Sequence, residues 1–439
     1  MKKWKVLAGV SVAAIVGAGV YVADVFPGEI APIAAIDVAS FSDDQIALGE
    51  NLANLGDCAA CHTPRGAQGM EGGLGLPTPF GVIYSTNITP DQDTGIGTWS
   101  FAAFDRAMRN GVDRAGNHLY PAFPYDHFVG TTREDLEALY QFLMTQDPVR
   151  ADRKPNELGF PFSFRPLLAG WKLLFHRDTA FVPNPEFTDE ENRGAYLAET
   201  LGHCSACHSP RNALGAVKRS EFMAGGEAEG WLAPPLGAAS ISPVGWDIDD
   251  YADYLFDGWS EHHGIAGGPM TAVVDHLHVA NEDDVFAIAA WLARITPEVD
   301  KDTRAARLTA IAALDLAEGF DPGLAGQQAP DDVLRGAQVF KDNCVKCHKQ
   351  RISDNQPASL GLTYAVNAPA PTNVFNAVLQ GIEPGLGATS RKMQPVALSA
   401  ENLAAVAAFV RWQFTDSPAW TNLDDQAAAA VAAKAAPGH

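Results

Sequence analysis

Hydrophobic residues recur along the chain in three stretches that share one order of parts and lie about 140 residues apart. Within each stretch, apolar residues three and four positions apart indicate helices that bury one face. The last helix of each stretch carries a large aromatic residue on its apolar face: Phe142, Trp291 and Phe409. Because this spacing is domain-sized and much longer than a solenoid repeat, the pattern predicts three helical domains in tandem.

The first predicted helix of every stretch contains a glycine. These residues are Gly49, Gly194 and Gly336. Since glycine has no side chain, a second helix can approach the backbone closely at that point. We therefore expect the first helix to cross the aromatic-bearing last helix at each glycine.

A third helix is predicted between these two in each repeat. Its start signals are Ser100, Asp247 and Thr372, and its stop signals are Gly111, Gly258 and Gly381. In the first repeat, Thr131 and Glu134 have the spacing of a capping box for the last helix. The third helix is amphipathic, so its apolar face is expected to cover whatever the core of the repeat holds.

The N-terminus has a different pattern, with a basic start followed by an uncharged apolar run from Val6 to Ala23. This is an export signal, either cleaved after Ala23 or retained as a membrane anchor. The positive-inside rule then keeps Lys2, Lys3 and Lys5 in the cytoplasm. It places the rest of the chain on the periplasmic side of the bacterial inner membrane.

Composition adds two limits to this picture. The chain has 439 residues, of which 47% are hydrophobic, so it can build several separate cores. Its formal net charge of -22 argues against a nucleic acid partner, because binding a phosphate backbone requires clustered lysine and arginine.

All six cysteines fall in Cys-x-x-Cys-His motifs, one in each repeat. The pairs are Cys58 and Cys61, Cys204 and Cys207, and Cys344 and Cys347, followed by His62, His208 and His348. A redox dithiol needs no histidine, and a zinc site needs further ligands at matching spacing. Two cysteines three apart can each form a thioether to one porphyrin, and the adjacent histidine then lies beneath the iron. The motifs therefore predict three covalently bound haem c groups with these histidines as proximal ligands.

The sixth iron ligand is expected in the loop after the haem-covering third helix, on the face opposite the histidine. In the second and third repeats this loop supplies Met270 and Met393. Most methionines only fill gaps in a core, but the position of these two within the repeat favours ligation. A thioether ligand raises the reduction potential of the haem.

The first repeat has Phe123 at the corresponding place, and a phenyl ring cannot coordinate iron. Aligning the haem-covering helices on their terminal glycines places Met108 three residues before Gly111, facing the distal side of the haem. We therefore expect Met108 to be the distal ligand of the first haem. The alternatives are His118, His127 and an open distal site.

An arginine also follows each proximal histidine by three residues: Arg65, Arg211 and Arg351. A haem propionate is a plausible partner for such an arginine, because paired carboxylate and guanidinium groups form strong hydrogen bonds. Pro64 and Pro210 are expected to shape the loop so that a backbone carbonyl accepts the second N–H of the histidine.

Together these features predict an all-α protein of three tandem class I cytochrome c domains after an N-terminal signal or anchor helix. The predicted ranges are 1–30 for the signal or anchor, 40–148 for domain 1, 149–185 for an aromatic linker, 186–297 for domain 2, 298–330 for a second linker, 331–416 for domain 3 and 417–439 for an Ala-rich tail. The aromatic linker is expected either to strap two domains together or to dock onto a partner.

The motifs resemble those of the three-haem cytochrome c subunits of membrane-bound bacterial dehydrogenases, which oxidise gluconate, alcohols, sugars and aldehydes. The likeness spans roughly residues 45–415 and is most specific in four segments: 61–65, 84–91, 95–100 and 202–212. The resemblance implies a non-catalytic subunit that passes electrons from a separate dehydrogenase subunit to membrane quinone or a terminal oxidase.

The resemblance also bears on the partner. Relatives paired with flavin or quinoprotein dehydrogenases commonly have methionine where this chain has Phe123. The Phe123 version looks more like those that accompany molybdenum hydroxylases, which pair a molybdopterin subunit with an iron–sulfur subunit. Two other functions remain open from the sequence: a free-standing haem enzyme that uses an open first haem, and a soluble electron shuttle.

Overall fold

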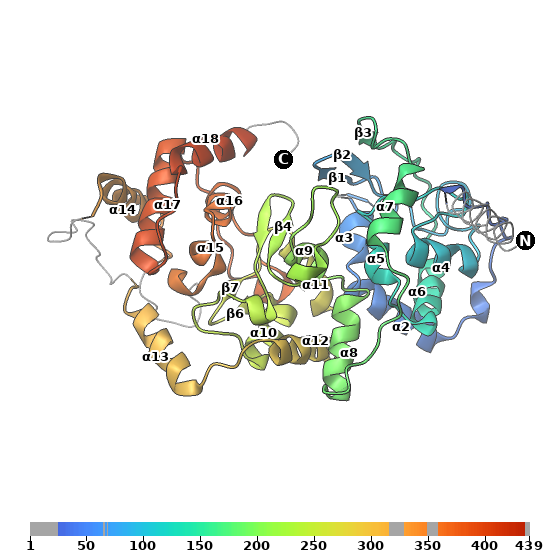
Figure 1. Ribbon diagram of the computed structural model, residues 1–439, viewed down its shortest axis with the longest axis horizontal. Coiled ribbons are helices and arrows are strands. Elements are labelled where there is room, and N and C mark those ends of the chain that lie inside the picture. The colour runs from blue at the N-terminus through green and yellow to red at the C-terminus, as the bar shows by residue number, and fades with distance from the viewer. Residues whose placement is uncertain (1–24, 65, 68, 316–328, 349–358, 435–439) are drawn as a thin grey trace, which may run out of the picture. The chain divides into compact units, whose positions relative to one another are not determined.

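The computed structural model describes residues 25–64, 66–67, 69–315, 329–348 and 359–434 (Figure 1). The chain forms two compact units. The first runs through Pro183 and includes Tyr196–His203 and Ala213–Ala216, and the second comprises Asn184–Ala195, Cys204–Asn212 and Val217–His439. Most of the predicted signal or anchor at 1–30 lies outside the described residues. No helix in the part of the chain that is described is long and apolar enough to cross a bilayer.

In each repeat the first helix, the haem-covering helix and the last helix follow one another in the predicted order, and other elements differ between repeats. The elements of the first repeat and its linker are η1 (Val38–Ser40), α2 (Asp43–Leu55), α3 (Cys58–His62), β1 (Gly75–Thr78), β2 (Gly81–Tyr84), α4 (Phe101–Asn110), α5 (Tyr125–Phe128), α6 (Arg133–Thr145), β3 (Glu157–Leu158) and α7 (Leu167–Phe175). Those of the second are α8 (Asp189–Glu199), α9 (Ser205–His208), η2 (Arg219–Glu221), β4 (Gly226–Ala228), β5 (Trp231–Ala233), η3 (Gly237–Ala239), α10 (Ile248–Asp257), β6 (Trp259–Ser260), β7 (Gly264–Ile265), α11 (Met270–His278), α12 (Glu282–Ile295) and α13 (Lys301–Ala312). Those of the third are α14 (Asp331–Asn343), η4 (Leu360–Leu362), α15 (Tyr364–Asn367), α16 (Thr372–Gln380), η5 (Leu386–Ala388), α17 (Ala400–Phe414) and α18 (Leu423–Lys434).

The predicted close helix crossings are confirmed in all three repeats. A Cβ atom on Gly49 of α2 would lie 2.1 Å from the carbonyl oxygen of Ala138 in α6. The equivalent distance is 1.8 Å at Gly194, where α8 meets α12, and 1.9 Å at Gly336, where α14 meets α17. These separations are shorter than any van der Waals contact, so only glycine lets the helix backbones approach this closely.

Most of the predicted boundaries of the haem-covering helices are also observed. Ser100 and Asp247 cap α4 and α10 through their side chains, and these helices end at glycines with positive φ. The third covering helix, α16, begins at Thr372 as predicted, although the residue at its N-cap is Pro371. The capping box at Thr131 and Glu134 was wrong. The side chain of Thr132, one residue later, accepts from the backbone N–H of Asp135.

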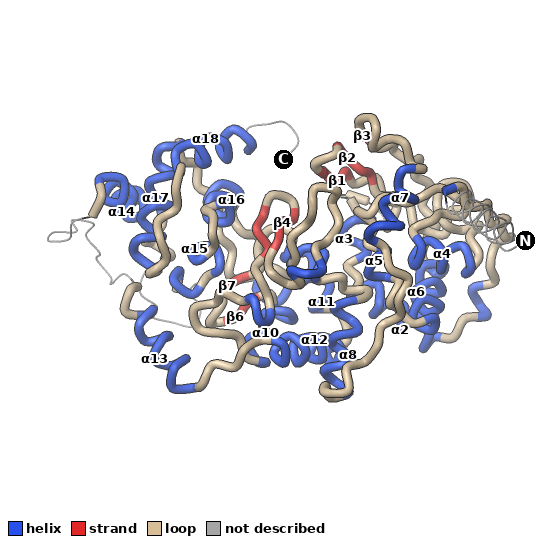
Figure 2. The backbone as a smooth tube through the Cα atoms, viewed as in Figure 1, coloured by secondary structure: helices blue, strands red, loops and turns tan. Residues whose placement is uncertain are grey.

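The all-α prediction omitted short antiparallel strands, which lie among the helices in three small sheets within the described residues (Figure 2). In the β4–β5 hairpin, Ala228 pairs with Trp231, and the two residues between them, Glu229 and Gly230, both have positive φ. That conformation is typical of a type I′ turn, whose twist matches that of the strands. Hairpins therefore lie in the loops that follow the first and second motifs.

The predicted linkers and tail contain regular structure. The aromatic linker 149–185 forms β3 and α7, and part of the linker 298–330 forms α13. The Ala-rich tail forms α18, in which Ala427 is fully buried. Residues 316–328 and 435–439, which belong to the second linker and the tail, lie outside the described part of the chain.

Candidate haem sites

The first Cys-x-x-Cys-His motif forms the short helix α3, so Cys58, Cys61 and His62 lie on little more than one helical turn. The ring of His62 is held by a hydrogen bond of 2.6 Å from its Nδ1 to the carbonyl oxygen of Thr86. A proton on Nδ1 leaves Nε2 with its lone pair, which is the arrangement a metal-binding imidazole requires.

The second motif has the same arrangement. His208, the last residue of α9, places its Nδ1 2.7 Å from the carbonyl oxygen of Pro234. Both carbonyls follow the second strand of a hairpin, since Thr86 comes after β2 and Pro234 comes after β5. The sequence predicts a carbonyl acceptor for each histidine but does not identify Thr86 or Pro234. Thr86 lies in segment 84–91, one of the four segments most specific to the family, and this could have indicated the acceptor in the first repeat.

In the third motif, Cys344 and Cys347 lie in turns that follow α14. His348 is half-buried, and its buried Nδ1 has no hydrogen-bond partner among the residues that the structure describes. Burial lowers the pKa of His348 to about 4, so the ring is neutral at physiological pH. A neutral buried imidazole is suited to binding iron, in which case the bond to the metal offsets the cost of its burial.

The pKa values of the histidines and cysteines in the motifs bear on the choice between haem attachment and a redox dithiol. Burial lowers the pKa values of His62 and His208, and their hydrogen bonds to the backbone carbonyls only partly oppose this shift. Both rings are therefore available as neutral imidazoles. Burial raises the pKa of Cys58 to about 12 and that of Cys344 to about 11. Because reactive dithiols have lowered pKa values, these cysteines do not fit a redox motif. They fit thioether attachment of a porphyrin above the histidine.

Of the three arginines that follow the motifs, only Arg211 is among the described residues. Its Nη2 donates to the carbonyl oxygen of Ala206, 2.8 Å away, within its own motif. Arg65 and Arg351 lie outside the described residues, so the propionate role stays a prediction for all three.

The two predicted loop methionines are half-buried and lie just beyond the haem-covering helices. Met270 is the first residue of α11. Met393 forms a backbone bridge with Ile382, the residue after the terminal glycine of α16. The bridge places the backbone of Met393 beside the end of α16, and Met270 lies in the segment that follows α10, where the distal ligands are predicted.

Backbone pairing supports the alignment of Phe123 with Met270. Val112, the residue after the terminal glycine of α4, pairs with His118, and the corresponding pair in the second repeat is Trp259 with Ile265. Phe123 lies five residues after His118, and Met270 lies five residues after Ile265. The ring of Phe123 packs against Phe128, with centroids 5.2 Å apart.

Met108 is buried in α4, with 5% of its surface exposed. Its counterparts on the other two covering helices, Leu255 and Val378, are buried as well. Both ring nitrogens of its rival His118 have protein neighbours, Nε2 at 3.2 Å from the carbonyl oxygen of Val25 and Nδ1 at 3.0 Å from Lys172. The rival His127 has Nδ1 3.2 Å from a carboxylate oxygen of Asp126. The distal ligand of the first haem remains a prediction, and Met108 is the candidate without such polar neighbours.

We predict that Met108→Ala removes methionine-type absorption from one haem in three, because no other thioether is predicted at the first site. Visible and near-infrared spectra of the oxidised and reduced protein measure this. Met144→Ala is the matched control, since Met144 is also buried in the first repeat, on α6. Retention of all methionine-type absorption in Met108→Ala would exclude Met108 as a ligand.

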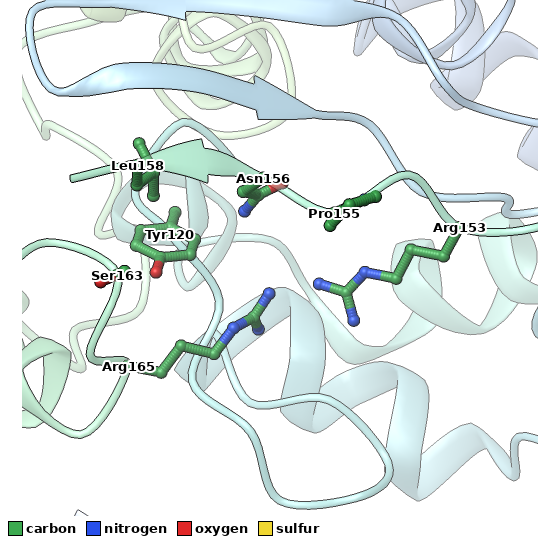
Figure 3. A pocket seen from close by; sticks show the side chains of 7 residues that line it. All are labelled: Tyr120, Arg153, Pro155, Asn156, Leu158, Ser163 and Arg165. Carbon is green, nitrogen blue, oxygen red and sulfur yellow. The ribbon is translucent and has the colours of Figure 1, made fainter. Parts of the chain in front are cut away.

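A pocket of about 370 Å³ lies beside the loop that leads to Phe123 (Figure 3). Its lining residues are Tyr120, Arg153, Pro155, Asn156, Leu158, Ser163 and Arg165, and none of them is acidic. Arg165 lies over the ring of Tyr120 at 5.2 Å and donates to the carbonyl oxygen of His118 at 2.9 Å. The aromatic linker thus holds the distal loop of the first repeat through these contacts.

The linker also exposes apolar side chains. Phe160 is 88% exposed, and Leu173 and Leu174 are 76% and 69% exposed. Within α7, Trp171 packs edge-on against Tyr125, with ring centroids 6.1 Å apart. The linker therefore packs against its own repeat through Trp171 and also exposes several apolar side chains.

Comparisons with known proteins agree with this geometry. A family model described as cytochrome c matches residues 46–147 and 333–414, which contain the first and third motifs. The chain is 41% identical over 413 residues to a subunit of nicotinate dehydrogenase from Pseudomonas putida, covering 91% of this chain and 33% of that protein. It is 36% identical to the gluconate 2-dehydrogenase cytochrome c subunit of Pantoea cypripedii, with 86% and 89% covered. It is 34% identical to the cytochrome c subunit of the quinone alcohol dehydrogenase of Gluconacetobacter polyoxogenes, with 83% and 79% covered.

The motif geometry and these likenesses define a c-type cytochrome, which binds haem c covalently. More particularly, the chain belongs to the cytochrome c subunits of bacterial dehydrogenases. Its role is electron transfer, and it is not the catalytic subunit. The chain spans only a third of the length of the nicotinate dehydrogenase subunit, so that protein's whole activity does not carry over.

Proposed function

We propose that this protein carries three haem c groups and passes electrons from a partner dehydrogenase to membrane quinone or a terminal oxidase. The observation that carries the proposal is the threefold recurrence of one arrangement. In every repeat a glycine-mediated helix crossing precedes Cys-x-x-Cys-His, and a haem-covering helix then ends at a glycine. The axial ligands, burial and hydrogen bonds of each iron set its potential, so no side chain needs to act as an acid, base or nucleophile.

Haem counting tests the number of centres. We expect three haems per chain by mass spectrometry and by haemochrome absorption of the purified protein. Replacing Cys204 and Cys207 together by alanine should lower the count to two, because no thioether then retains the second porphyrin. The same double replacement at Cys58 and Cys61, or at Cys344 and Cys347, should also remove one haem. A wild-type count below three would contradict the proposal.

The partner we propose is a dehydrogenase of the molybdenum hydroxylase kind, with a molybdopterin subunit and an iron–sulfur subunit. Phe123 in the distal loop supports this choice, as does the similarity to a protein named as a subunit of nicotinate dehydrogenase. A flavin or quinoprotein dehydrogenase is the alternative. Co-purification from the native host followed by metal and cofactor analysis distinguishes them, since only the first contains molybdenum.

We also propose that the haem domains lie on the periplasmic side of the inner membrane. The basic residues before the apolar run from Val6 to Ala23 support this orientation. N-terminal sequencing of the protein from periplasmic and membrane fractions tests the proposal and shows whether the run is cleaved or retained. Recovery of haem-loaded protein from the cytoplasm alone would contradict it.

A further inference from the structure

The β4–β5 hairpin contacts both sides of the second haem site. On the proximal side, the carbonyl oxygen of Pro234, directly after β5, accepts from Nδ1 of His208. On the other side, the ring of Trp231 in β5 lies against Gly268, where a Cβ atom would come within 2.6 Å of two ring atoms. Gly268 has a φ of 60° and precedes the distal candidate Met270 by two residues. A displacement of β5 would therefore move the backbone at both axial ligands.

The same strand is joined to α16, the haem-covering helix of the third repeat (Figure 1). The Oδ1 of Asn373 accepts from the backbone N–H of Leu232 at 2.8 Å, and its Nδ2 donates to the carbonyl oxygen of Leu232 at 2.9 Å. One side-chain amide thus pairs both backbone groups of a residue 141 positions away, as a neighbouring strand would. Asn373 is only 8% exposed, so water cannot readily replace these two bonds.

Asn376, one turn later on α16, makes a weaker connection. Its Nδ2 donates to the carbonyl oxygen of Gly230 at 2.9 Å, in the turn of the hairpin. This contact is exposed to solvent, where water can substitute for the lost partner. The two asparagines therefore reach the same hairpin from the same helix but differ in burial and in the number of bonds.

We infer that Asn373 is a positioning residue through which the third repeat fixes the axial ligation of the second haem. The inference rests on the proposed function, since it requires haem at both sites. Replacing Asn373 leaves the part-buried N–H and carbonyl of Leu232 without these partners. Strand β5 regains those partners only by shifting, and the shift displaces Pro234 and Trp231 on either side of it. The bond from the thioether of Met270 to the iron is then weaker. Because methionine ligation raises the reduction potential of a haem, the potential of the second haem falls.

The test is a spectroelectrochemical titration of the intact three-haem protein. Met270→His first identifies the second haem, as the centre whose potential falls when imidazole replaces thioether. We expect Asn373→Leu, which keeps the branched shape of the side chain and removes both hydrogen bonds, to lower that potential and weaken the methionine–iron band of one haem in three. Asn376→Leu is the matched control and should leave all three potentials unchanged.

Asn373→Asp provides a second variant if the leucine protein folds poorly. Aspartate can still accept from the N–H of Leu232 but cannot donate to its carbonyl, so a downward shift is expected here too. The inference is overturned if either folded variant carries three haems with wild-type potentials. It is also overturned if Asn373→Leu and Asn376→Leu change the potential of the second haem equally. A wild-type chain with fewer than three haems would instead refute the proposed function, and the haem count separates the two failures.

Discussion

Replacing His208 with alanine is expected to leave the second haem attached while changing its iron from low-spin to high-spin. The proposed thioethers at Cys204 and Cys207 would still hold the porphyrin, so the haem count should not change. The iron loses its proximal imidazole, and the carbonyl oxygen of Pro234 loses the Nδ1 donor 2.7 Å away. One third of the low-spin signal should disappear from the electron paramagnetic resonance and visible spectra. Electron transfer through the second haem should fall steeply, because the ligand that sets its potential is gone.

His278 supplies the matched control for this experiment. It also lies at the end of a helix, α11, and its Nδ1 is 2.9 Å from a backbone carbonyl oxygen, that of Phe256. No Cys-x-x-Cys precedes it. His278→Ala should therefore leave all three haems low-spin. An unchanged spectrum in His208→Ala, or an equal change in both variants, would show that His208 is not the proximal ligand.

Replacing Gly336 with alanine is expected to destabilise the third repeat, because the added methyl group has no room at the helix crossing. The new Cβ would lie 1.9 Å from the carbonyl oxygen of Ala405 and 2.8 Å from the Cβ of Phe409. Helices α14 and α17 must then separate, which loosens the packing of Phe340 against Phe409, whose rings are 5.2 Å apart. Overpacking of this kind costs about 1–3 kcal/mol, and the loss of apolar contact between the helices adds to it.

Gly170 is the control for the effect of the methyl group itself. It lies within helix α7, and a Cβ there would have nothing within 4 Å. Gly170→Ala should leave stability unchanged or raise it by up to about 1 kcal/mol, because alanine is the better helix former. Thermal unfolding followed by circular dichroism and haem absorbance compares the two variants. Equal stability of both would contradict a tight crossing at Gly336.

Sequence periodicity predicted the helix crossings because the relevant information is local. A helix that must meet another at close range needs a glycine at one position of its apolar face, and Gly49, Gly194 and Gly336 are visible as such. Helix ends were predicted nearly as well, but not to the residue. Thr131 and Thr132 are both able to cap α6, and only the backbone path selects Thr132.

The distal ligands were harder to predict from the sequence. The lengths of the loops predicted the places of Met270 and Met393, because a ligand must return to the iron within a fixed reach. In the first repeat, however, the loop places Phe123 there, and the choice among Met108, His118 and His127 depends on what surrounds each side chain. The structure supplied those surroundings, such as the carbonyl and lysine neighbours of His118.

The sequence by itself determined that the chain binds haem, since two cysteines and a histidine at a fixed spacing meet one porphyrin without help from the rest of the fold. Only the tertiary structure decided what orients the ligands. The acceptors for His62 and His208 lie 24 and 26 residues further along the chain, and Asn373 reaches Leu232 across 141 residues. The spacing of a motif is fixed by covalent geometry over a few residues. Contacts across long loops depend on where hairpins and helices turn the chain, and no local pattern records that.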